Sequence, residues 1–412
     1  MRIKKVFPVF VALAIFLFIL PIVGVGCNFV SEKAVNTFAP AEINKPFFFN
    51  ADEADSIDGK LPPEFGILAE AYKRLSEDYV DKSKLDPKKL SQGAVKGMIE
   101  ALDDPYSSYV DPKSHELELT NFEGKFEGIG AVISMKDKQL TIVSPIAESP
   151  AEKAGVKAGD KILKIDGELT SKMTLIEATM KIRGPKGTPV NLVILHPEET
   201  EPVEIQIVRD EIKVESVVLE MRGDIAYIRI TQFLKSTGGD LDAVLKGAIK
   251  KGARGVVLDL RNNPGGLLNS ATDVASEFLA MGLVAKVVDD EGRESPVPVT
   301  RGGIATHLPL IILVNEGSAS GSEIVAGALQ DYGRAKLAGS QTFGKGSVQT
   351  VRDLSDGSAL HITTYRWLTP YGRPIDGVGL TPDFALELKD EELVDWAIDY
   401  LKKLMAAGSL FA

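Results

Sequence analysis

The chain has 412 residues, of which 44% are hydrophobic, and it carries a formal net charge of −11. This length predicts about two or three domains with sizeable cores, and the acidic balance argues against nucleic acid as a partner. The single cysteine, Cys27, excludes a disulfide within one chain and a zinc site built from thiolates. The four histidines show no paired metal-ligand spacing, so we expect neither a metal nor another cofactor.

Residues 1–27 predict an export signal or a membrane anchor. A basic N-terminus precedes an uncharged run, Val6 to Gly26, that is long enough to span a bilayer. The positive charges predict a cytoplasmic N-terminus and therefore an extracytoplasmic position, periplasmic or in the cell envelope, for the rest of the chain. Cys27 follows small residues, as at a lipoprotein cleavage site, but Gly24 stands where such signals usually carry a bulky aliphatic residue. Lipidation of Cys27 and an uncleaved anchor both stay open, and either would tether the protein to the membrane.

Residues 28–63 mix proline, asparagine, alanine and acidic side chains, which predicts a linker with little regular structure. Two amphipathic helices are predicted near 64–79 and 88–102, because apolar residues recur there at helical spacing. A turn at Asp103 to Tyr106 ends the second helix. Residues 64–118 thus form an N-terminal helical region. Its helices are better suited to packing or dimerisation than to chemistry, so a homodimer is expected.

Between residues 119 and 208 the pattern changes to short strands separated by glycine-rich turns. These pieces, in their order, resemble a PDZ domain. The resemblance implies that a peptide C-terminus is added as a strand to a sheet edge. Backbone amides of a glycine-rich loop would hold its carboxylate. An ordinary pair of β-turns in a small β domain is the alternative. The residues of the expected loop are Gly128, Ile129, Gly130 and Ala131.

A helix predicted at 175–182 would flank the peptide groove, and Arg183 follows it directly. The simplest interpretation of Arg183 is a solvated helix end. The alternative is a contact with the catalytic domain or with substrate, which would give this residue a regulatory role.

Residues 209–388 contain repeated strand-turn-helix units, which indicate an α/β core with crossover helices. Two turns at the ends of buried strands, Asn263 to Gly266 and Ser318 to Gly321, could meet at one site. Their glycines expose backbone amides, which suits an oxyanion hole. The predicted buried strands span 225–230, 255–260 and 308–314.

The stretch from Leu308 to Gln349 carries the candidate chemistry. An apolar strand leads into a small-residue turn and then a helix, which is how many folds expose a nucleophilic serine beside a helix N-terminus. Lys345 lies between two glycines and could approach that turn, and a buried neutral lysine can serve as the base. Taken alone, however, these residues fit a helix cap and an exposed loop better.

An ordered set of motifs resembles the carboxyl-terminal processing peptidases, also called tail-specific proteases. The resemblance implies a crotonase/ClpP-like ββα protease core beside a PDZ domain and an N-terminal helical region. It also implies a serine endopeptidase that cuts proteins near their C-termini, with substrate tails recruited and activity gated by the PDZ domain. Besides the PDZ-like segment, the matching motifs are Leu102–Ser107, Leu258–Gly266, Ser318–Ile324, Gln330–Arg334, Phe343–Gly346 and Thr369–Arg373.

Carried over residue by residue, the resemblance assigns the nucleophile to Ser320 and the base to Lys345. Gln349 matches a position that supports the lysine in some members, and Asp331 matches an aspartate whose role is expected to be structural. To accept a proton at neutral pH, the lysine must have its pKa lowered from ~10.4 to ~7–8 by burial. The amides expected to bind the oxyanion are those of Gly321 and of Gly265 or Gly266.

Many family members carry alanine where this chain has Gly321. Because that residue contributes only its backbone amide, the difference does not affect the assignment. Residues 389–412 predict a C-terminal amphipathic helix docked on the core or on a partner subunit.

Two other classes of protein compete with this one. A non-catalytic PDZ scaffold or adaptor on an inactive protease fold is disfavoured by the intact Ser320 and Lys345. A crotonase-type acyl-CoA enzyme is disfavoured by the export signal and the PDZ-like module. The expected partners are protein or peptide substrates bound by their C-termini, a second copy of the chain, and an activating or adaptor protein.

Overall fold

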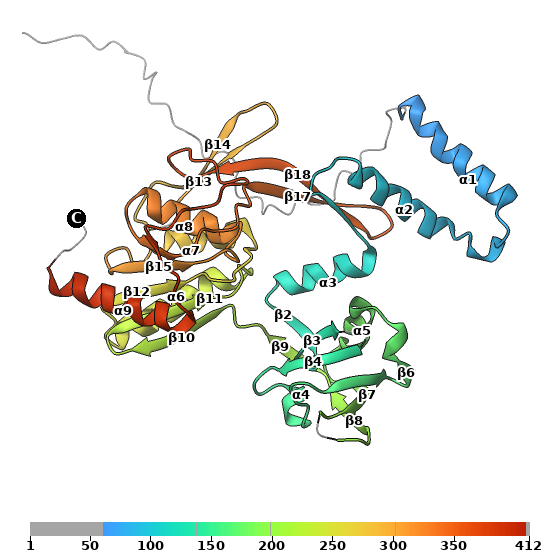
Figure 1. The fold of residues 1–412 in the computed structure, drawn as a ribbon, viewed down its shortest axis with the longest axis horizontal. Coiled ribbons are helices and arrows are strands. Elements are labelled where there is room, and N and C mark those ends of the chain that lie inside the picture. The colour runs from blue at the N-terminus through green and yellow to red at the C-terminus, as the bar shows by residue number, and fades with distance from the viewer. Residues whose placement is uncertain (1–60, 137–138, 198, 301, 409–412) are drawn as a thin grey trace, which may run out of the picture. The chain divides into compact units, whose positions relative to one another are not determined.

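The computed structural model describes residues 61–136, 139–197, 199–300 and 302–408 (Figure 1). By its contacts the chain divides into Met1–Asn44 and Lys45–Ala412, and all described residues belong to the second unit. The predicted export segment, Cys27 and nearly all of the predicted linker lie outside the described residues. Within those ranges, no helix has both the length and the apolarity needed to cross a membrane.

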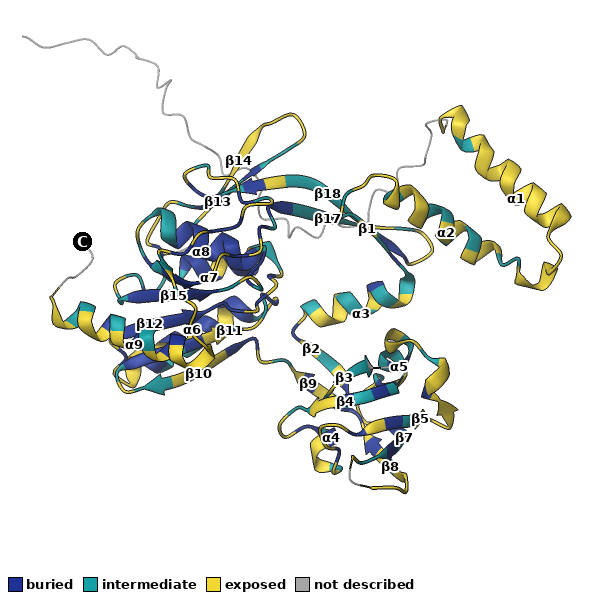
Figure 2. Ribbon diagram, viewed as in Figure 1, coloured by how far each residue is buried: buried dark blue, intermediate teal, exposed yellow. Residues whose placement is uncertain are grey.

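The two predicted N-terminal helices are confirmed, and both are exposed. Neither helix buries a single residue, although each has an apolar stripe, and Figure 2 shows both largely exposed. Asp86 caps the second helix by accepting hydrogen bonds from the backbone N–H groups of Lys88 and Lys89. The elements of this region are η1 (Pro63–Phe65), α1 (Gly66–Asp78), η2 (Lys82–Lys84), α2 (Pro87–Glu100), β1 (Ser108–Val110) and α3 (Pro112–Phe122).

The PDZ-like segment folds around a sheet with the strand order β3-β4-β5-β7-β8, so β3 is an edge strand. Its core is apolar, with Ile142, Ile162 and Leu192 fully buried. A separate pair, β2 with β9, closes the module, which therefore continues past the predicted end at residue 208. Its elements are β2 (Lys125–Gly128), β3 (Ala131–Lys136), β4 (Gln139–Pro145), α4 (Pro150–Lys153), β5 (Lys161–Ile165), β6 (Glu168–Leu169), η3 (Thr170–Lys172), α5 (Leu175–Ile182), β7 (Pro189–Leu195), β8 (Val203–Val208) and β9 (Asp210–Lys213).

The α/β core is built on a second sheet, with the order β10-β11-β12-β15-β16-β19. All neighbours are parallel except β10 and β11. Its elements are β10 (Val217–Arg222), β11 (Ile225–Ile230), α6 (Thr237–Lys250), β12 (Gly255–Asp259), α7 (Leu268–Ser276), β15 (Leu310–Val314), α8 (Gly321–Asp331), β16 (Lys336–Gly339), β19 (Phe384–Ala385) and α9 (Asp390–Ala406).

Both faces of this sheet are covered, which explains why its strands read as continuous apolar runs. In β12, Val256 and Leu258 pack into a core with side chains of α6, α7 and α8. Val257, between them, packs on the opposite face with Leu393 and Leu401 of α9. Figure 2 shows β12, β15, α7 and α8 almost entirely buried. The sheet thereby fixes the carboxyl ends of β12 and β15, where the predicted site lies.

A third, antiparallel sheet was only partly anticipated from the sequence. Its longest strand, β18, pairs with β17, with β1 and with β13. Strand β14 extends the sheet beyond β13. Lys345 lies two residues before β17, so this sheet carries the predicted base while the parallel sheet carries the predicted nucleophile. Its further strands are β13 (Leu283–Val288), β14 (Glu294–Pro298), β17 (Ser347–Asp353) and β18 (Ala359–Leu368).

Helix α3, which follows β1, is attached to this sheet by two histidine–carboxylate pairs. His115 Nε2 lies 3.0 Å from Asp353 of β17, and Glu118 lies 3.2 Å from Nε2 of His361 in β18. Because β2 follows α3 after two residues, these contacts connect the antiparallel sheet to the start of the PDZ-like module.

Candidate active site

Ser320 occupies a strained turn between β15 and α8. Its φ of 52° and ψ of −112° lie outside the usual regions for a residue with a side chain. A sharp strand-to-helix turn of this kind lifts a nucleophilic serine clear of the sheet. Backbone bonds hold the turn in place: Ala319 N–H donates to Asn263 O at 3.0 Å, and Phe343 N–H donates to Ser318 O at 3.0 Å. Strain that the surroundings maintain in this way is typical of functional sites.

The carboxylate of Glu323 joins the serine turn to the lysine loop. It is fully buried, and its Oε2 accepts the backbone N–H groups of both Ser320 and Lys345, each at 2.9 Å. Its Oε1 accepts from Thr342 Oγ1 at 2.6 Å and from Gly344 N–H at 2.7 Å. Four donors thus satisfy a carboxylate that would otherwise be costly to bury. One oxygen atom fixes the backbone of the two predicted catalytic residues relative to each other.

The backbone of Lys345 is held from its other side by Trp367, whose Nε1 donates to Lys345 O at 3.0 Å. The side chain is half-buried, and its Nζ lies 5.3 Å from the ring centroid of Tyr106. Burial lowers the pKa of Lys345, while the nearby carboxylate of Asp104 opposes that shift. The direction agrees with a base that must become neutral. Within the described residues, Lys345 Nζ and Ser320 Oγ do not hydrogen-bond to each other.

Gln349 lies on the same face of β17 as Ser347, as predicted for a strand. Its side-chain amide, however, hydrogen-bonds to other residues rather than to Lys345. Its Nε2 donates to Ser347 Oγ at 2.9 Å and to Thr363 Oγ1 at 3.2 Å. The pairing with β18 is irregular between Val348 and Gln349. In this arrangement Gln349 orders the strand after Lys345, and support of the amine itself stays a prediction.

The predicted oxyanion glycines lie against the serine. A Cβ added at Gly265 would meet Ser320 Cβ at 2.8 Å and Gly321 N at 2.9 Å, so only glycine fits at that position. However, Gly265 N–H already donates to Asn263 Oδ1 at 2.9 Å, which makes it the weaker donor candidate. Among the described residues, neither Gly266 N–H nor Gly321 N–H finds an acceptor. The geometry therefore favours Gly266 N–H and Gly321 N–H as the two donors to the oxyanion.

Asp331 has the structural role expected for it. It lies at the end of α8, and its carboxylate accepts from Arg373 Nε at 2.7 Å and from Tyr371 N–H at 2.8 Å. These bonds connect the motif at Gln330–Arg334 to the one at Thr369–Arg373, and they place no charge beside Ser320.

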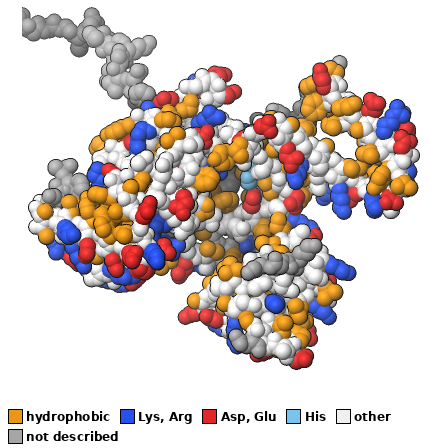
Figure 3. All heavy atoms as spheres, viewed as in Figure 1, with side chains coloured by type: hydrophobic (Ala, Val, Ile, Leu, Met, Phe, Trp, Pro, Cys, Tyr) orange, Lys and Arg blue, Asp and Glu red, His pale blue; other side chains and the backbone are white. Residues whose placement is uncertain are grey.

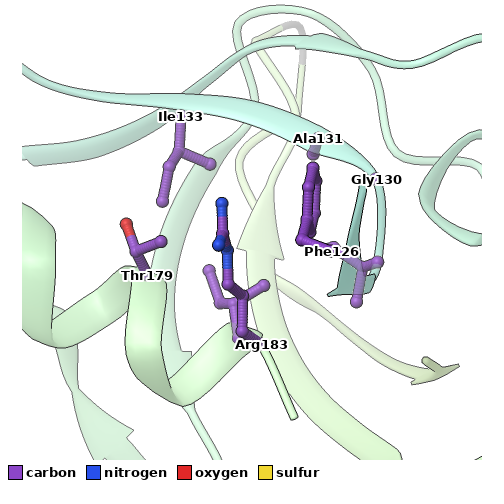
Figure 4. Close-up of a pocket in the computed structure, with 8 residues that line it drawn as sticks. Phe126, Gly130, Ala131, Ile133, Thr179 and Arg183 are labelled. Carbon is purple, nitrogen blue, oxygen red and sulfur yellow. The ribbon is translucent and has the colours of Figure 1, made fainter. Parts of the chain in front are cut away.

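The predicted peptide-binding loop borders an apolar groove between β3 and α5 (Figure 4). Gly130 has a φ of 75°, and a Cβ there would lie 2.4 Å from Ser149 Cβ, so the loop requires glycine. In the described chain, the N–H groups of Ile129 and Gly130 donate to no other residue. They remain available to a carboxylate. The groove is lined by Phe126, Ile129, Gly130, Ala131, Ile133, Thr179, Ile182 and Arg183.

The prediction of Arg183 as a solvated helix end is wrong. Figure 4 shows its guanidinium rising into the groove, and it lies 4.2 Å from the centroid of the Phe126 ring. It also donates to Thr120 Oγ1 at 2.9 Å and Asn121 Oδ1 at 2.7 Å, both on α3. Burial lowers the pKa of Arg183. The Arg183 side chain turns into the groove, where it finds two hydrogen-bond acceptors on α3 and the face of an aromatic ring.

Sequence reasoning missed three residues of the site: Glu323, Tyr106 and Trp367. Only Glu323 carried a local signal, the Ser-x-x-Glu pattern that Ser320 begins, and that pattern is typical of an ordinary helix cap. The described residues also contain no group of three or more side chains suited to hold a metal ion.

The fold and this site define a peptidase with a PDZ module, and comparisons with known proteins agree. The model of peptidase family S41 matches residues 224–386, a PDZ domain model matches 141–195, and the model of the activating protease CtpB N-terminal domain matches 22–114. A solved Bacteroides fragilis protein assigned to the S41 proteases has the same fold, with a TM-score of 0.52 and 16% identity over 84% of this chain and 99% of its own.

Relatives of higher identity show the family. The carboxy-terminal-processing protease of Bartonella bacilliformis is 43% identical, over 78% of this chain and 74% of its own length. The carboxy-terminal processing protease CtpA of Bacillus subtilis is 40% identical, over 79% of this chain and 70% of its own. The chain belongs to the carboxy-terminal processing proteases, which are serine-type endopeptidases of family S41. The resemblance inferred from the sequence motifs is thus confirmed.

Proposed function

We propose that this protease cleaves proteins near their C-termini with Ser320 as nucleophile and Lys345 as base, and that its PDZ domain recruits the tails. The observation that carries the proposal is the shared acceptor, Glu323 Oε2, which holds the backbone of both residues. This shared acceptor keeps the backbone of the base close to the backbone of the nucleophile.

In the proposed reaction, neutral Lys345 Nζ takes the proton of Ser320 Oγ as that oxygen attacks the scissile carbonyl. The carbonyl becomes an oxyanion held by Gly321 N–H and Gly266 N–H. When the tetrahedral intermediate collapses, the C–N bond breaks and the lysine ammonium gives its proton to the leaving amine. A water molecule, deprotonated by the same lysine, then attacks the acyl-enzyme ester and regenerates Ser320.

Gating by the PDZ domain is the second part of the proposal. Arg183 fills part of the groove and bonds to Thr120 and Asn121, and α3 is itself paired with β17 and β18 through His115 and Glu118. A bound tail would compete with Arg183 for this space. Occupancy of the groove would then alter the attachment of α3 and, through the sheet that carries Lys345, the catalytic pair.

Tail recruitment is tested with one unfolded protein that carries either an apolar or a charged C-terminus. We expect the purified full chain to cleave the apolar-tailed substrate about tenfold faster, because Ile129, Ile133 and Ile182 line the groove with apolar surface. Gel-based kinetics at substrate concentrations below KM measure this ratio. Equal rates for the two tails would contradict recruitment, even if cleavage itself depends on Ser320.

The competing scaffold hypothesis makes a different prediction for the same experiment. A non-catalytic adaptor would bind the apolar tail and leave both substrates intact under every condition. Cleavage that is lost in Ser320→Ala while tail binding is retained would exclude that hypothesis.

We further propose that a second copy covers the exposed face of α1. Ile67, Leu68, Tyr72, Leu75 and Tyr79 recur at helical spacing on this face and are 37–63% exposed. Figure 3 shows hydrophobic side chains at the surface of this part of the chain. A short helix with no buried residue is marginal in water, and a patch of this kind usually marks an interface.

The double variant Leu68→Lys/Leu75→Lys is therefore expected to convert a dimer into a monomer. Light scattering coupled to size-exclusion chromatography measures the mass. The matched control, Glu70→Gln/Glu77→Gln, makes the same change in net charge on the same helix and should stay dimeric. A monomeric wild-type chain would refute the proposal directly.

Export and membrane tethering by residues 1–27, with or without a lipid on Cys27, also stay proposals based on the N-terminal sequence. Cell fractionation of the full chain beside a version that begins at residue 28 tests them. Equal amounts of both versions in the cytoplasmic fraction would contradict the proposal.

A further inference from the structure

The loop Leu102–Ser107, between α2 and β1, lies beside the predicted base. It contributes Tyr106, whose ring centroid is 5.3 Å from Lys345 Nζ, within the range of a cation–π contact. The loop also borders a cavity of about 410 Å³. The peptidase match begins only at residue 224, so this contact comes from a different part of the chain. The cavity is lined by Leu102, Asp103, Asp104, Pro105, Tyr106, Ser347, Thr363, Arg366 and Asp376.

Local bonds place Tyr106 securely. The carboxylate of Asp104 accepts from Tyr106 N–H at 3.0 Å and from Ser107 Oγ at 2.6 Å. Ser107 Oγ in turn accepts from Thr363 N–H of β18 at 3.0 Å. The next three residues, β1, pair with the same strand. The loop is thus fastened to the sheet that leads to Lys345, so the aromatic ring and the amine are held by one framework.

The contact favours one protonation state of the lysine. An aromatic face attracts an ammonium ion and has little attraction for a neutral amine. Burial raises the pKa of Tyr106, so its hydroxyl stays neutral and a phenolate does not form beside the lysine. The tyrosine ring therefore stabilises the ammonium form of Lys345 in a half-buried site, where burial otherwise disfavours the charged form.

Other charged groups surround this position, but most are already engaged. Glu323 of α8 accepts four hydrogen bonds, and Asp376 accepts Gly346 N–H at 3.2 Å and lies 3.9 Å from Arg366 of β18. Only the carboxylate of Asp104 opposes the effect of burial on the pKa of Lys345. The charged and titratable groups in question are Asp104 and Tyr106 of the loop, Glu323, Arg366 and Asp376.

We propose that Tyr106 is a positioning residue for Lys345, whose ring holds the ammonium that forms when the lysine takes the serine proton. This inference rests on the proposed function, in which Lys345 alternates between amine and ammonium in every cycle. The helical region before the PDZ domain then supplies part of the surroundings of the base, through the loop that joins α2 to β1.

The chemical reactivity of Lys345 tests this proposal without any need for catalysis. The full chain, in a Ser320→Ala background, is treated with acetic anhydride across a pH series, and acetylation of Lys345 is followed by peptide mass spectrometry. Only the neutral amine reacts, so the midpoint reports its titration. We expect Tyr106→Leu to move the midpoint down by about 0.5–1 pH unit, because the ammonium loses its aromatic contact. Tyr106→Phe keeps the ring and should keep the wild-type midpoint.

The pH dependence of cleavage provides the second measurement. Activity falls at acidic pH as Lys345 becomes protonated. In Tyr106→Leu the acidic limb of the pH profile should therefore move to lower pH, by an amount similar to the shift of the acetylation midpoint. Tyr106→Phe should have the wild-type profile. A midpoint or limb that is the same in all three chains, or that moves upward in Tyr106→Leu, would overturn the proposal. If Tyr106→Leu does not fold, Tyr106→Met is expected to show the same downward shift.

The two measurements also separate this proposal from the proposed function. Cleavage by Lys345→Ala at the wild-type rate would refute both the proposed function and this inference. Cleavage that requires Lys345 but shows no dependence on the ring at residue 106 would refute the inference alone.

Discussion

Replacement of Ser320 by alanine, or of Lys345 by methionine, is expected to lower kcat/KM for protein cleavage by about 10⁴-fold or more. Each change removes one half of the proposed nucleophile–base unit, and residues that act as a unit lose most of their effect when either is removed. The double variant should accordingly be no slower than the slower single variant. Initial rates on an unfolded substrate, with binding measured separately, check this result.

The free energy of unfolding provides an independent test of the strained backbone at Ser320. Ser320 is held at a φ of 52° and a ψ of −112°, a conformation that glycine adopts with much less strain. We expect Ser320→Gly to be as inactive as Ser320→Ala but more stable to denaturant, by roughly 1 kcal/mol. Full activity of purified Ser320→Ala, or retained turnover in Lys345→Met, would refute the proposed mechanism outright.

Replacement of Glu323 by alanine is expected to damage both folding and catalysis. Its carboxylate is fully buried and accepts the hydrogen bonds of Ser320, Thr342, Gly344 and Lys345, so truncation leaves four donors without a partner. Loss of one partner in a buried charged network costs about 3–5 kcal/mol. The turn and the loop would also lose their common anchor. Misplacement of catalytic groups by about 1 Å costs about 10²-fold in rate.

Denaturant unfolding and initial rates on the same samples check both parts of this prediction. Glu316→Gln is the matched control, because Glu316 lies on the same turn but is exposed, and its carboxylate accepts from Ser340 Oγ at 2.9 Å. We expect that control to stay within about 0.5 kcal/mol of wild type. Glu323→Gln should resemble Glu323→Ala more than wild type, because its amide N–H₂ would face N–H donors. A stable, fully active Glu323→Ala would show that the shared acceptor has no role.

The amino-acid sequence by itself determined the elements and their order. Hydrophobic periodicity is a local property, so the helices α1, α2 and α5, the start of α9 and the strands β11, β12 and β15 were predicted within a few residues. Turn chemistry is local as well, and it singled out the loop at Gly128–Ala131 and the turn that carries Ser320. The order of the motifs was enough to identify the family, which the relatives then confirmed.

The tertiary structure alone decided which distant residues meet. Strand β18 pairs with β1, where Ser108 faces His361, and with β13, where Lys286 faces Leu368, and no short-range pattern encodes such distant pairing. The same reason applies to Glu323, which looks like a helix cap in sequence yet joins the serine turn to the lysine loop. It applies to Arg183, which has acceptors only because α3 lies beside it. Tyr106 faces Lys345 only after β1 has joined β18, so its contact with the base follows from long-range strand pairing and not from local sequence.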